Sequence, residues 1–441
     1  MLSLVEPIEI VGLGASGLSA ARFLADAGYR PGCMDSRADV AGVGVIRELG
    51  LPEPLLGQLD AKRLRNAGHI VLSPGVPRAL PEISEAISAG VPVIGDVELF
   101  AQVADARIVA ITGSNGKSTV TTLVRDIAQA AGLDVRAGGN LGPAALDLLG
   151  GQSPDWYVLE LSSFQLESTF SLRPRIATIL NVSEDHLDRY DDMSAYAAVK
   201  ARVLDGAGTA VLSTDSELQP ECEVRRFTIF EPEAGQYGVA LFNGAGWLAY
   251  GRELLVPVDQ LAVPGRHNVA NALAALAISD AMRIPRDVAL RAICHFSGLE
   301  HRCQLVAQAD GVRWINDSKG TNVGATVAAV EGLAGNGPIV LLAGGLGKGA
   351  DFAPLGEAVH GRVRSVLLFG QDALLIDAML AEDTPREMVA DLDMAVARAQ
   401  EIAQAGDTVL LSPACASYDM FKSFEARGKE FAAKVHKALN I

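Results

Sequence analysis

A loop rich in glycine and hydroxyl side chains joins a predicted strand to a predicted helix at residues 112–119. The strand covers 108–111, and a helix is predicted over 120–131 because apolar residues recur there at helical spacing. In such a loop the glycines and the helix N-terminus receive phosphates, Lys117 reaches the terminal phosphates, and Ser118 or Thr119 can hold a magnesium ion. The loop therefore predicts a nucleotide site. Because Ile111 stands where the usual pattern has glycine, the loop is a compact variant, and an incidental turn before a helix is the alternative.

A second glycine-rich turn, residues 12–17, follows the first predicted strand and opens a helix. Asp35 ends the next strand, where a dinucleotide-binding protein would use it to accept from a ribose hydroxyl. The pattern is weak, because glycines at such turns also serve packing alone. One dinucleotide-like turn and one ATP-type loop in the same chain require a reaction that uses both.

Acidic and basic residues follow several other predicted strands. Glu160 ends the strand 157–161 and is suited to magnesium, with a helix cap as its alternative role, although Ser162 fits that cap better. His186 lies in a dense polar segment and is a possible second metal ligand, whereas a lone histidine is more often a surface or capping residue. Lys200 lies on a predicted helix over 194–204, and its spacing alone does not distinguish it from a solvated lysine.

Further polar residues occur late in the chain. Asn268 and Asn271 share one face of a predicted helix, 268–281, where two amides can contact a purine or cap the helix. Arg302 is a fixed cation suited to phosphate, and Asp317 and Lys319 could form a solvated ion pair.

Parallel α/β sheets must position these residues, because apolar strands alternate with helical segments along the chain. The expected strands are 8–11, 70–72, 108–111, 158–161, 176–180, 339–342, 366–369 and 409–411. Residues 221–263 are expected to form an irregular inserted sheet. With 441 residues, two or three units are expected, and we place boundaries near Gly95 and Gly298, which gives 1–95, 96–298 and 299–441.

Charge and composition exclude several classes of partner. The net charge is −16 and no block of Lys or Arg interrupts it, which argues against nucleic acid or an anionic membrane. No apolar run is long enough for a membrane span and the first residues lack a basic segment, so a soluble cytoplasmic enzyme is expected. Five scattered cysteines without ligand spacing indicate reduced thiols.

Taken in order, these segments resemble the Mur ligase family from about Ile10 to the C-terminus. The matching segments are 112–119, 160–167, 181–186, 265–271, 301–302, 317–319 and 411–417. Segments 96–100, 164–167 and 417–428 are most similar to the members that add D-glutamate.

The resemblance implies an α/β protein of three domains. These are a Rossmann-like domain for a UDP-linked substrate (1–95), a central P-loop ATPase-like domain with a mostly parallel sheet (96–298), and a Rossmann-like C-terminal α/β domain that closes over ATP and binds the amino acid (299–441). It implies an ATP-dependent ligase that joins D-glutamate to UDP-N-acetylmuramoyl-L-alanine through an acyl phosphate, with ATP and two magnesium ions. A monomer is expected, with no nucleic acid and no membrane as partner.

The resemblance also implies roles for individual residues. Lys117, His186 and Lys200 would be catalytic, and Lys200 matches a carbamylated lysine, whose negative charge would suit a magnesium site. The remaining implied roles are ATP binding by Gly113, Ser114, Asn115, Gly116, Lys117, Ser118, Thr119, Asn268, Asn271, Arg302, Asp317 and Lys319; binding of the UDP-linked substrate by Gly14, Ala15, Ser16, Ser36, Arg37, Asn140, Gln165 and His186; D-glutamate binding by Thr321, Lys348, Ser417 and Phe424; and metal binding by Thr119, Glu160, His186 and carbamylated Lys200.

Two positions depart from the family pattern, and other functions compete with this one. Leu346 stands where many members have an acidic residue, and Ser213 replaces a more usual Asn. The alternatives are a related ligase such as folylpolyglutamate synthase or one for another amino acid, a nicotinamide-dependent oxidoreductase, and a non-catalytic nucleotide switch.

Overall fold

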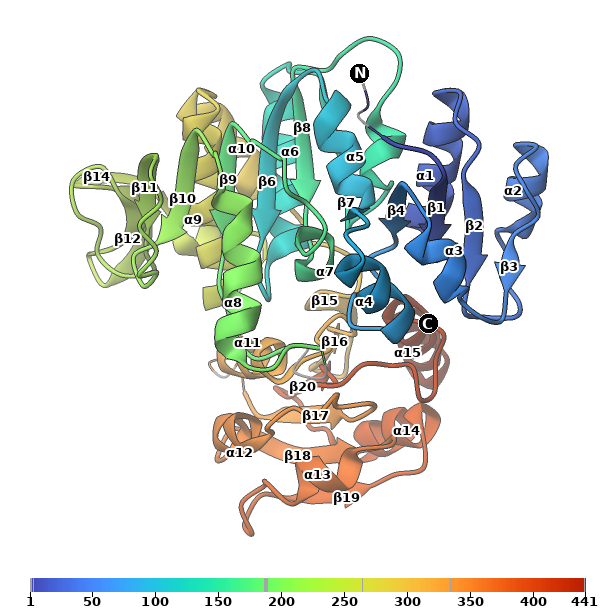
Figure 1. Cartoon of the computed structure of the whole chain (residues 1–441). Coiled ribbons are helices and arrows are strands. Elements are labelled where there is room, and N and C mark those ends of the chain that lie inside the picture. Colours follow the sequence, from blue (N-terminus) through green and yellow to red (C-terminus); the bar gives the residue numbers. More distant parts are fainter. Residues whose placement is uncertain are drawn as a thin grey trace.

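The computed structural model describes residues 2, 4–185, 189–263, 265–333, 335, 337–439 and 441. Within these residues the strands form three sheets, which succeed one another along the chain. Figure 1 shows the N-terminal unit beside the central one and the C-terminal unit below it. The predicted three-unit α/β architecture is confirmed, whereas the exact boundaries at residues 95 and 298 stay predictions.

The N-terminal sheet is parallel, with strand order β3-β2-β1-β4-β5. Its elements are β1 Ile8–Val11, α1 Ala15–Asp26, β2 Gly32–Asp35, α2 Val43–Glu48, β3 Leu55–Leu56, α3 Ala61–Arg65, β4 His69–Leu72, α4 Pro81–Ser88 and β5 Val93–Ile94. Apart from Glu9 and His69, the residues of β1 and β4 are apolar and buried, as expected for a parallel sheet covered by helices on both faces.

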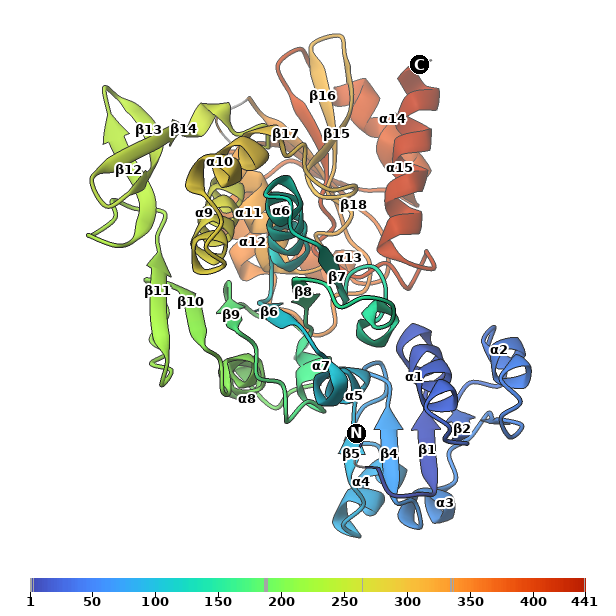
Figure 2. The same cartoon turned by 90° about the horizontal axis from the view of Figure 1, so that it is seen from above.

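The central sheet has the order β14-β13-β12-β11-β10-β9-β6-β8-β7, in which β12, β13 and β14 form an antiparallel meander at one edge. Its elements are α5 Asp96–Val103, β6 Arg107–Thr112, α6 Lys117–Ala130, β7 Val135–Gly139, η1 Ala145–Leu148, β8 Trp156–Glu160, α7 Ser163–Leu166, β9 Ile176–Ile179, α8 Met193–Ala201, η2 Arg202–Leu204, β10 Thr209–Ser213, β11 Glu223–Phe227, β12 Tyr237–Phe242, β13 Ala245–Tyr250, β14 Glu253–Pro257, η3 Val258–Gln260, α9 Arg266–Ala281 and α10 Arg286–His295. The meander confirms the irregular sheet expected over 221–263. Figure 2 shows α6, α9 and α10 packed together on one side of this sheet.

The C-terminal sheet has the order β15-β16-β20-β17-β18-β19, with β15 antiparallel to β16 and the other pairs parallel. Its elements are β15 Gln304–Ala309, β16 Val312–Asn316, α11 Val323–Leu333, β17 Ile339–Ala343, α12 Ala353–Val359, β18 Val363–Leu368, α13 Ala373–Asp377, β19 Arg386–Met388, α14 Leu392–Ile402, β20 Thr408–Leu411 and α15 Phe424–Leu439.

Buried apolar side chains connect the first two units. One core cluster runs without interruption from Ile10 and Leu24 of the N-terminal sheet and α1 to Leu146 of η1 and Tyr157 of β8. The C-terminal unit has its own two clusters, one on each face of its sheet. None of the helices in the described part of the chain has the length and apolar character needed to span a lipid bilayer.

Candidate active site

A cavity of about 680 Å³ lies where the three units meet. Gly75 and Pro77 come from the N-terminal unit, Lys117 and Glu160 from the central unit, and Lys348 from the C-terminal unit. A smaller cavity of about 130 Å³ shares Asn115, Arg302 and Lys319 with it and continues toward α9. An elongated ligand can therefore lie across both cavities.

The predicted nucleotide loop forms one wall. Gly116 has a φ of 82°, and a Cβ there would lie 2.4 Å from the Asn271 side chain, so only glycine fits the turn that opens α6. This helix begins at Lys117, three residues earlier than predicted, so the last residues of the loop form its first turn. Lys117 Nζ donates to the carbonyl oxygens of Gly113 and Ser114, at 2.8 and 2.9 Å. Burial lowers the pKa of Lys117, and the negative charge of Glu160 partly offsets this.

The residues around Glu160 fit a divalent cation. Its Oε1 accepts from Asn140 Nδ2 at 2.6 Å, whereas its buried Oε2 has no hydrogen-bond partner. A buried carboxylate oxygen without a partner is costly unless a ligand completes its environment. Among the described residues no cluster of three His, Cys, Asp or Glu side chains could hold a metal by itself. Because magnesium commonly takes one or two protein oxygens and several from phosphates and water, the partnerless Glu160 Oε2 is a suitable protein ligand for it.

Lys200 is buried, with 1% of its surface exposed, so the solvated-lysine alternative is wrong. Its Nζ donates to Gly113 O at 2.9 Å and lies 4.5 Å from the centre of the Tyr196 ring. Burial and the charge of Lys117 lower the pKa of Lys200 to about 7, and Asp185 offsets part of this shift. An amine of that pKa is substantially neutral at physiological pH and can act as a nucleophile.

The smaller cavity contains the residues expected to bind the base and ribose. Asn268 and Asn271 line it together, and Asn271 Nδ2 lies 3.4 Å from Asn268 Oδ1. Arg302 Nη2 donates to Ser118 Oγ at 2.9 Å, which connects the C-terminal unit to the nucleotide loop.

Asp317 and Lys319 do not form the solvated pair considered above. Asp317 is 7% exposed and accepts from Ser412 Oγ and the Cys303 N–H. Burial raises the pKa of Asp317 to about 6 even though these bonds and Arg302 lower it. Lys319 Nζ lies 3.7 Å from the centre of the Phe424 ring, and burial lowers the pKa of Lys319 to about 8. The two side chains are therefore held by separate partners.

All four residues expected to contact the amino acid line the larger cavity: Thr321, Lys348, Ser417 and Phe424. Lys348 lies 3.6 Å from Asp185 and has a φ of 54°, which is uncommon for a residue other than glycine. Leu346 lines the same wall at the position that departs from the family pattern.

The turn expected to bind the UDP group lies outside this cavity. Gly14 precedes α1, Ala15 and Ser16 form its first residues, and Ser36 and Arg37 follow β2. Each oxygen of Asp35 accepts two hydrogen bonds. Oδ1 accepts from the backbone N–H and Nε of Arg37, and Oδ2 accepts from the Leu13 N–H and from Arg37 Nη2. Since a carboxylate has about four acceptor positions, Asp35 supports the turn and does not serve as the ribose acceptor that the motif suggested.

The remaining expected substrate residues differ in their placement. Asn140 lines the large cavity. Gln165 is buried, and its Oε1 accepts from Ser162 N–H in a capping box at the start of α7, so Ser162 is the cap as predicted. His186 lies outside the described residues.

Asp185, Tyr196 and Asn322 are among the cavity residues to which the sequence assigned no role. Tyr196 Oη lies 3.2 Å from Ser114 Oγ, and Asn322 Nδ2 donates to Asp185 Oδ2 at 3.0 Å. Asp185 belongs to the segment 181–186 named above, and Asn322 follows Thr321, which was expected to bind the amino acid. Tyr196 carries no sequence signal, because its position depends on how α8 packs.

The fold and the site define a class: a three-unit α/β nucleotide-binding protein in which a phosphate loop and the other two units share one cavity. Comparisons with known proteins agree. Models of the Mur ligase MurD-like N-terminal domain, the Mur ligase middle domain and the Mur ligase glutamate ligase domain match residues 6–95, 111–279 and 301–415. The chain belongs to the Mur ligase family.

Relatives cover nearly its whole length. It is 50% identical to the UDP-N-acetylmuramoylalanine--D-glutamate ligase of Nitrosococcus oceani over 98% of this chain and 96% of that protein. It is 47% identical to the enzyme of the same name from Pseudomonas aeruginosa over 97% of each. The crystal structure of UDP-N-acetylmuramate-alanine ligase from Thermotoga maritima has the same fold, with a TM-score of 0.64, 18% identity, and coverage of 98% of this chain and 99% of that one.

Proposed function

We propose that this chain is an ATP-dependent ligase that forms an amide bond between the L-alanyl carboxylate of UDP-N-acetylmuramoyl-L-alanine and the amine of D-glutamate, in cytoplasmic peptidoglycan precursor synthesis. The observation that carries the proposal is the shared cavity, which is lined by Lys117 of the phosphate loop and by Lys348 and Ser417 of the C-terminal unit. Similarity to D-glutamate ligases over nearly the full chain supports the choice of substrates.

The first step is attack of the alanyl carboxylate on the γ-phosphorus of ATP, which gives an acyl phosphate and ADP. Lys117 lines the cavity and would face the charge that develops on the transferred group, and Arg302, which donates to Ser118, would add a second fixed cation beside the loop. Asn268 and Asn271 would hold the adenine, and Asp317 and Lys319 the ribose and phosphates.

In the second step the amine of D-glutamate attacks the acyl carbon, and the tetrahedral intermediate expels phosphate. Thr321, Lys348, Ser417 and Phe424 would hold the amino acid on the C-terminal side of the cavity. A closed cavity excludes water and so protects the acyl phosphate from hydrolysis.

Two magnesium ions would neutralise the phosphate charge. Glu160 and Thr119 are suited to one of them, and Lys200, as a carbamate, together with His186, to the other. We also propose that the enzyme acts as a monomer, since each of the three walls of the cavity comes from the same chain.

The test is phosphate release measured with the purified protein, ATP and magnesium. Release is expected only when both UDP-N-acetylmuramoyl-L-alanine and D-glutamate are present, with L-glutamate in place of the D-isomer giving little. Release with neither acceptor present would indicate a nucleotide switch, and release with another amino acid or a folate would indicate a related ligase. Either result would overturn the proposal.

A further inference from the structure

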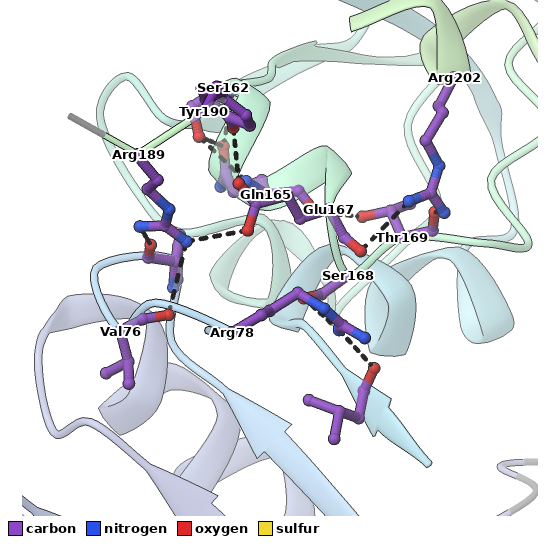
Figure 3. A network of polar contacts seen from close by, with 12 residues as sticks. Val76, Arg78, Ser162, Gln165, Glu167, Ser168, Thr169, Arg189, Tyr190 and Arg202 are labelled. Atoms are coloured by element: carbon purple, nitrogen blue, oxygen red, sulfur yellow. Dashed lines mark hydrogen bonds and ion pairs between the residues drawn. The ribbon is translucent and has the colours of Figure 1, made fainter. Parts of the chain in front are cut away.

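Three arginines from two units converge on residues 167–169, the segment that follows α7 (Figure 3). Arg78, from the loop before α4, donates to Val93 O and Ser168 Oγ at 3.1 and 3.2 Å. Arg202, at the start of η2, donates to the carbonyl oxygens of residues 167 and 169. Arg189 follows the polar segment after β9 and lies between the two units.

Arg189 has contacts that the other two arginines lack. Its Nη2 lies 2.9 Å from Glu167 Oε2, and only 12% of each side chain is exposed. Its guanidinium also donates to Pro74 O at 2.9 Å and Val76 O at 3.5 Å, both in the N-terminal unit. The group stacks on the Phe164 ring, with its carbon 3.9 Å from the ring centre. A planar cation with several donors is suited to hold carbonyls, a carboxylate and a ring at once.

The carbonyls that Arg189 holds belong to a wall of the large cavity. Gly75, which lies between them, lines the cavity, as do Phe164 and Arg189 itself. Ser73, the residue before Pro74, donates to Gly12 O at 2.7 Å, so this loop is also joined to the first glycine-rich turn. Displacing the loop would therefore move both the cavity wall and the turn.

The ion pair of Arg189 and Glu167 is also connected to the phosphate loop. Glu167 Oε1 accepts from Tyr190 Oη at 2.6 Å. Arg189 and Tyr190, which are consecutive in the chain, therefore bind the two oxygens of Glu167. The rings of Tyr190 and Tyr196 are 5.2 Å apart, and Tyr196 Oη contacts Ser114 Oγ. Contacts thus run without a gap from the N-terminal loop to the nucleotide loop.

We propose that Arg189 is a positioning residue for the UDP-linked substrate. It fixes the 74–76 loop against the phosphate loop, so that a substrate held by the N-terminal unit presents its carboxylate to the nucleotide. This inference rests on the proposed function. Glu167 contributes by holding the guanidinium, since a buried cation without its carboxylate is strongly destabilised.

Kinetics of Arg189→Met, Arg189→Lys and Glu167→Gln test the proposal. The matched control is Arg202→Met, because Arg202 binds the same 167–169 segment but contacts neither the 74–76 loop nor the cavity. Arg189→Met is expected to raise KM for UDP-N-acetylmuramoyl-L-alanine by about tenfold or more, while KM for ATP changes by less than about threefold. For Arg189→Lys and Glu167→Gln, the KM for UDP-N-acetylmuramoyl-L-alanine should lie between the values of Arg189→Met and the wild type. Arg202→Met should lower Tm without this selective change in KM.

Two results would overturn the proposal. One is a KM for the UDP-linked substrate that stays within about twofold of wild type in Arg189→Met and Arg189→Lys. The other is an equal rise in the KM values for UDP-N-acetylmuramoyl-L-alanine, ATP and D-glutamate, seen in Arg202→Met as well. That result would indicate that Arg189 has only a general packing role. If Arg189→Met does not fold, Arg189→Lys and Glu167→Gln decide the question. Failure of the proposed function is distinguishable, because the wild type itself would then show no substrate-dependent phosphate release.

Discussion

Lys117, Lys200 and Arg302 gather positive charge around the nucleotide loop. Burial lowers the pKa of each. The charge of Arg302 lowers the pKa of Lys117 further, and the charge of Lys117 lowers that of Lys200. A bound polyphosphate would relieve this repulsion, so the free site is arranged for an anion before the anion arrives. This local field explains how a chain with a net charge of −16 can bind an anionic nucleotide.

The first prediction concerns Lys117. Lys117→Ala removes the cation that we propose faces the transferred phosphate, and turnover should fall by about a thousandfold or more, since fixed charges at developing charge supply several kcal/mol. Circular dichroism and Tm should remain close to wild type. The exposed Lys62→Ala is the control, and its activity should not change. Retained activity in Lys117→Ala would show that the loop does not bind the reacting phosphate.

A second prediction concerns Asp317 in the ligand-free protein. Its pKa is raised to about 6, so its contribution to stability is full below the unfolded pKa of about 4 and is lost as pH rises through about 6. Asp317→Asn removes that loss. Urea unfolding should therefore show the variant gaining about 2–3 kcal/mol relative to wild type between pH 4 and pH 7.5. If the unfolding free energies of wild type and Asp317→Asn changed equally with pH, the pKa of Asp317 would not be raised.

Elements bring these residues together because the strands end at the same edge of each sheet. Glu160 ends β8 and Thr112 ends β6, and these neighbouring parallel strands place the carboxylate beside the nucleotide loop. The position of Glu160 beside the loop can be predicted from the sequence, because apolar runs indicate the buried parallel strands and the residues that follow them lie at the sheet edge.

Two glycines of the first turn allow a matched prediction at this scale. A Cβ at Gly17 would lie 1.8 Å from Gly12 O, whereas one at Gly14 would meet nothing within 4 Å. Gly17→Ala should destabilise the protein by about 3 kcal/mol, and Gly14→Ala by about 1 kcal/mol or less. Urea unfolding measures both.

Gly14→Ala should instead weaken binding of the UDP-linked substrate, because its methyl group occupies the space through which a diphosphate approaches the helix N-terminus. Its KM for that substrate should rise by about tenfold, with KM for ATP unchanged. Unchanged kinetics in Gly14→Ala would mean that this turn does not bind the substrate.

At the scale of the whole molecule, the cavity exists only because the three units meet. The sequence predicted the nucleotide loop and the buried parallel strands β1, β4, β6, β8, β9, β17, β18 and β20, because motifs and apolar runs specify local segments. Asn140, Lys348 and Ser417, which the family resemblance selected as substrate residues, line the cavity. The sequence did not predict that Lys200 is buried, since that depends on Gly113 and Tyr196 packed around it. The same reason explains why contacts between distant segments, such as Arg189 with Pro74, carry no sequence signal.

The most direct test of the proposed chemistry follows one oxygen atom. UDP-N-acetylmuramoyl-L-alanine labelled with ¹⁸O in its alanyl carboxylate is incubated with the enzyme, ATP, magnesium and D-glutamate, and the released phosphate is examined by mass spectrometry. Attack of the carboxylate on ATP, followed by expulsion of phosphate, transfers one labelled oxygen to each phosphate. Phosphate that carries no label while the amide product forms would contradict phosphorylation of the carboxylate in this cavity.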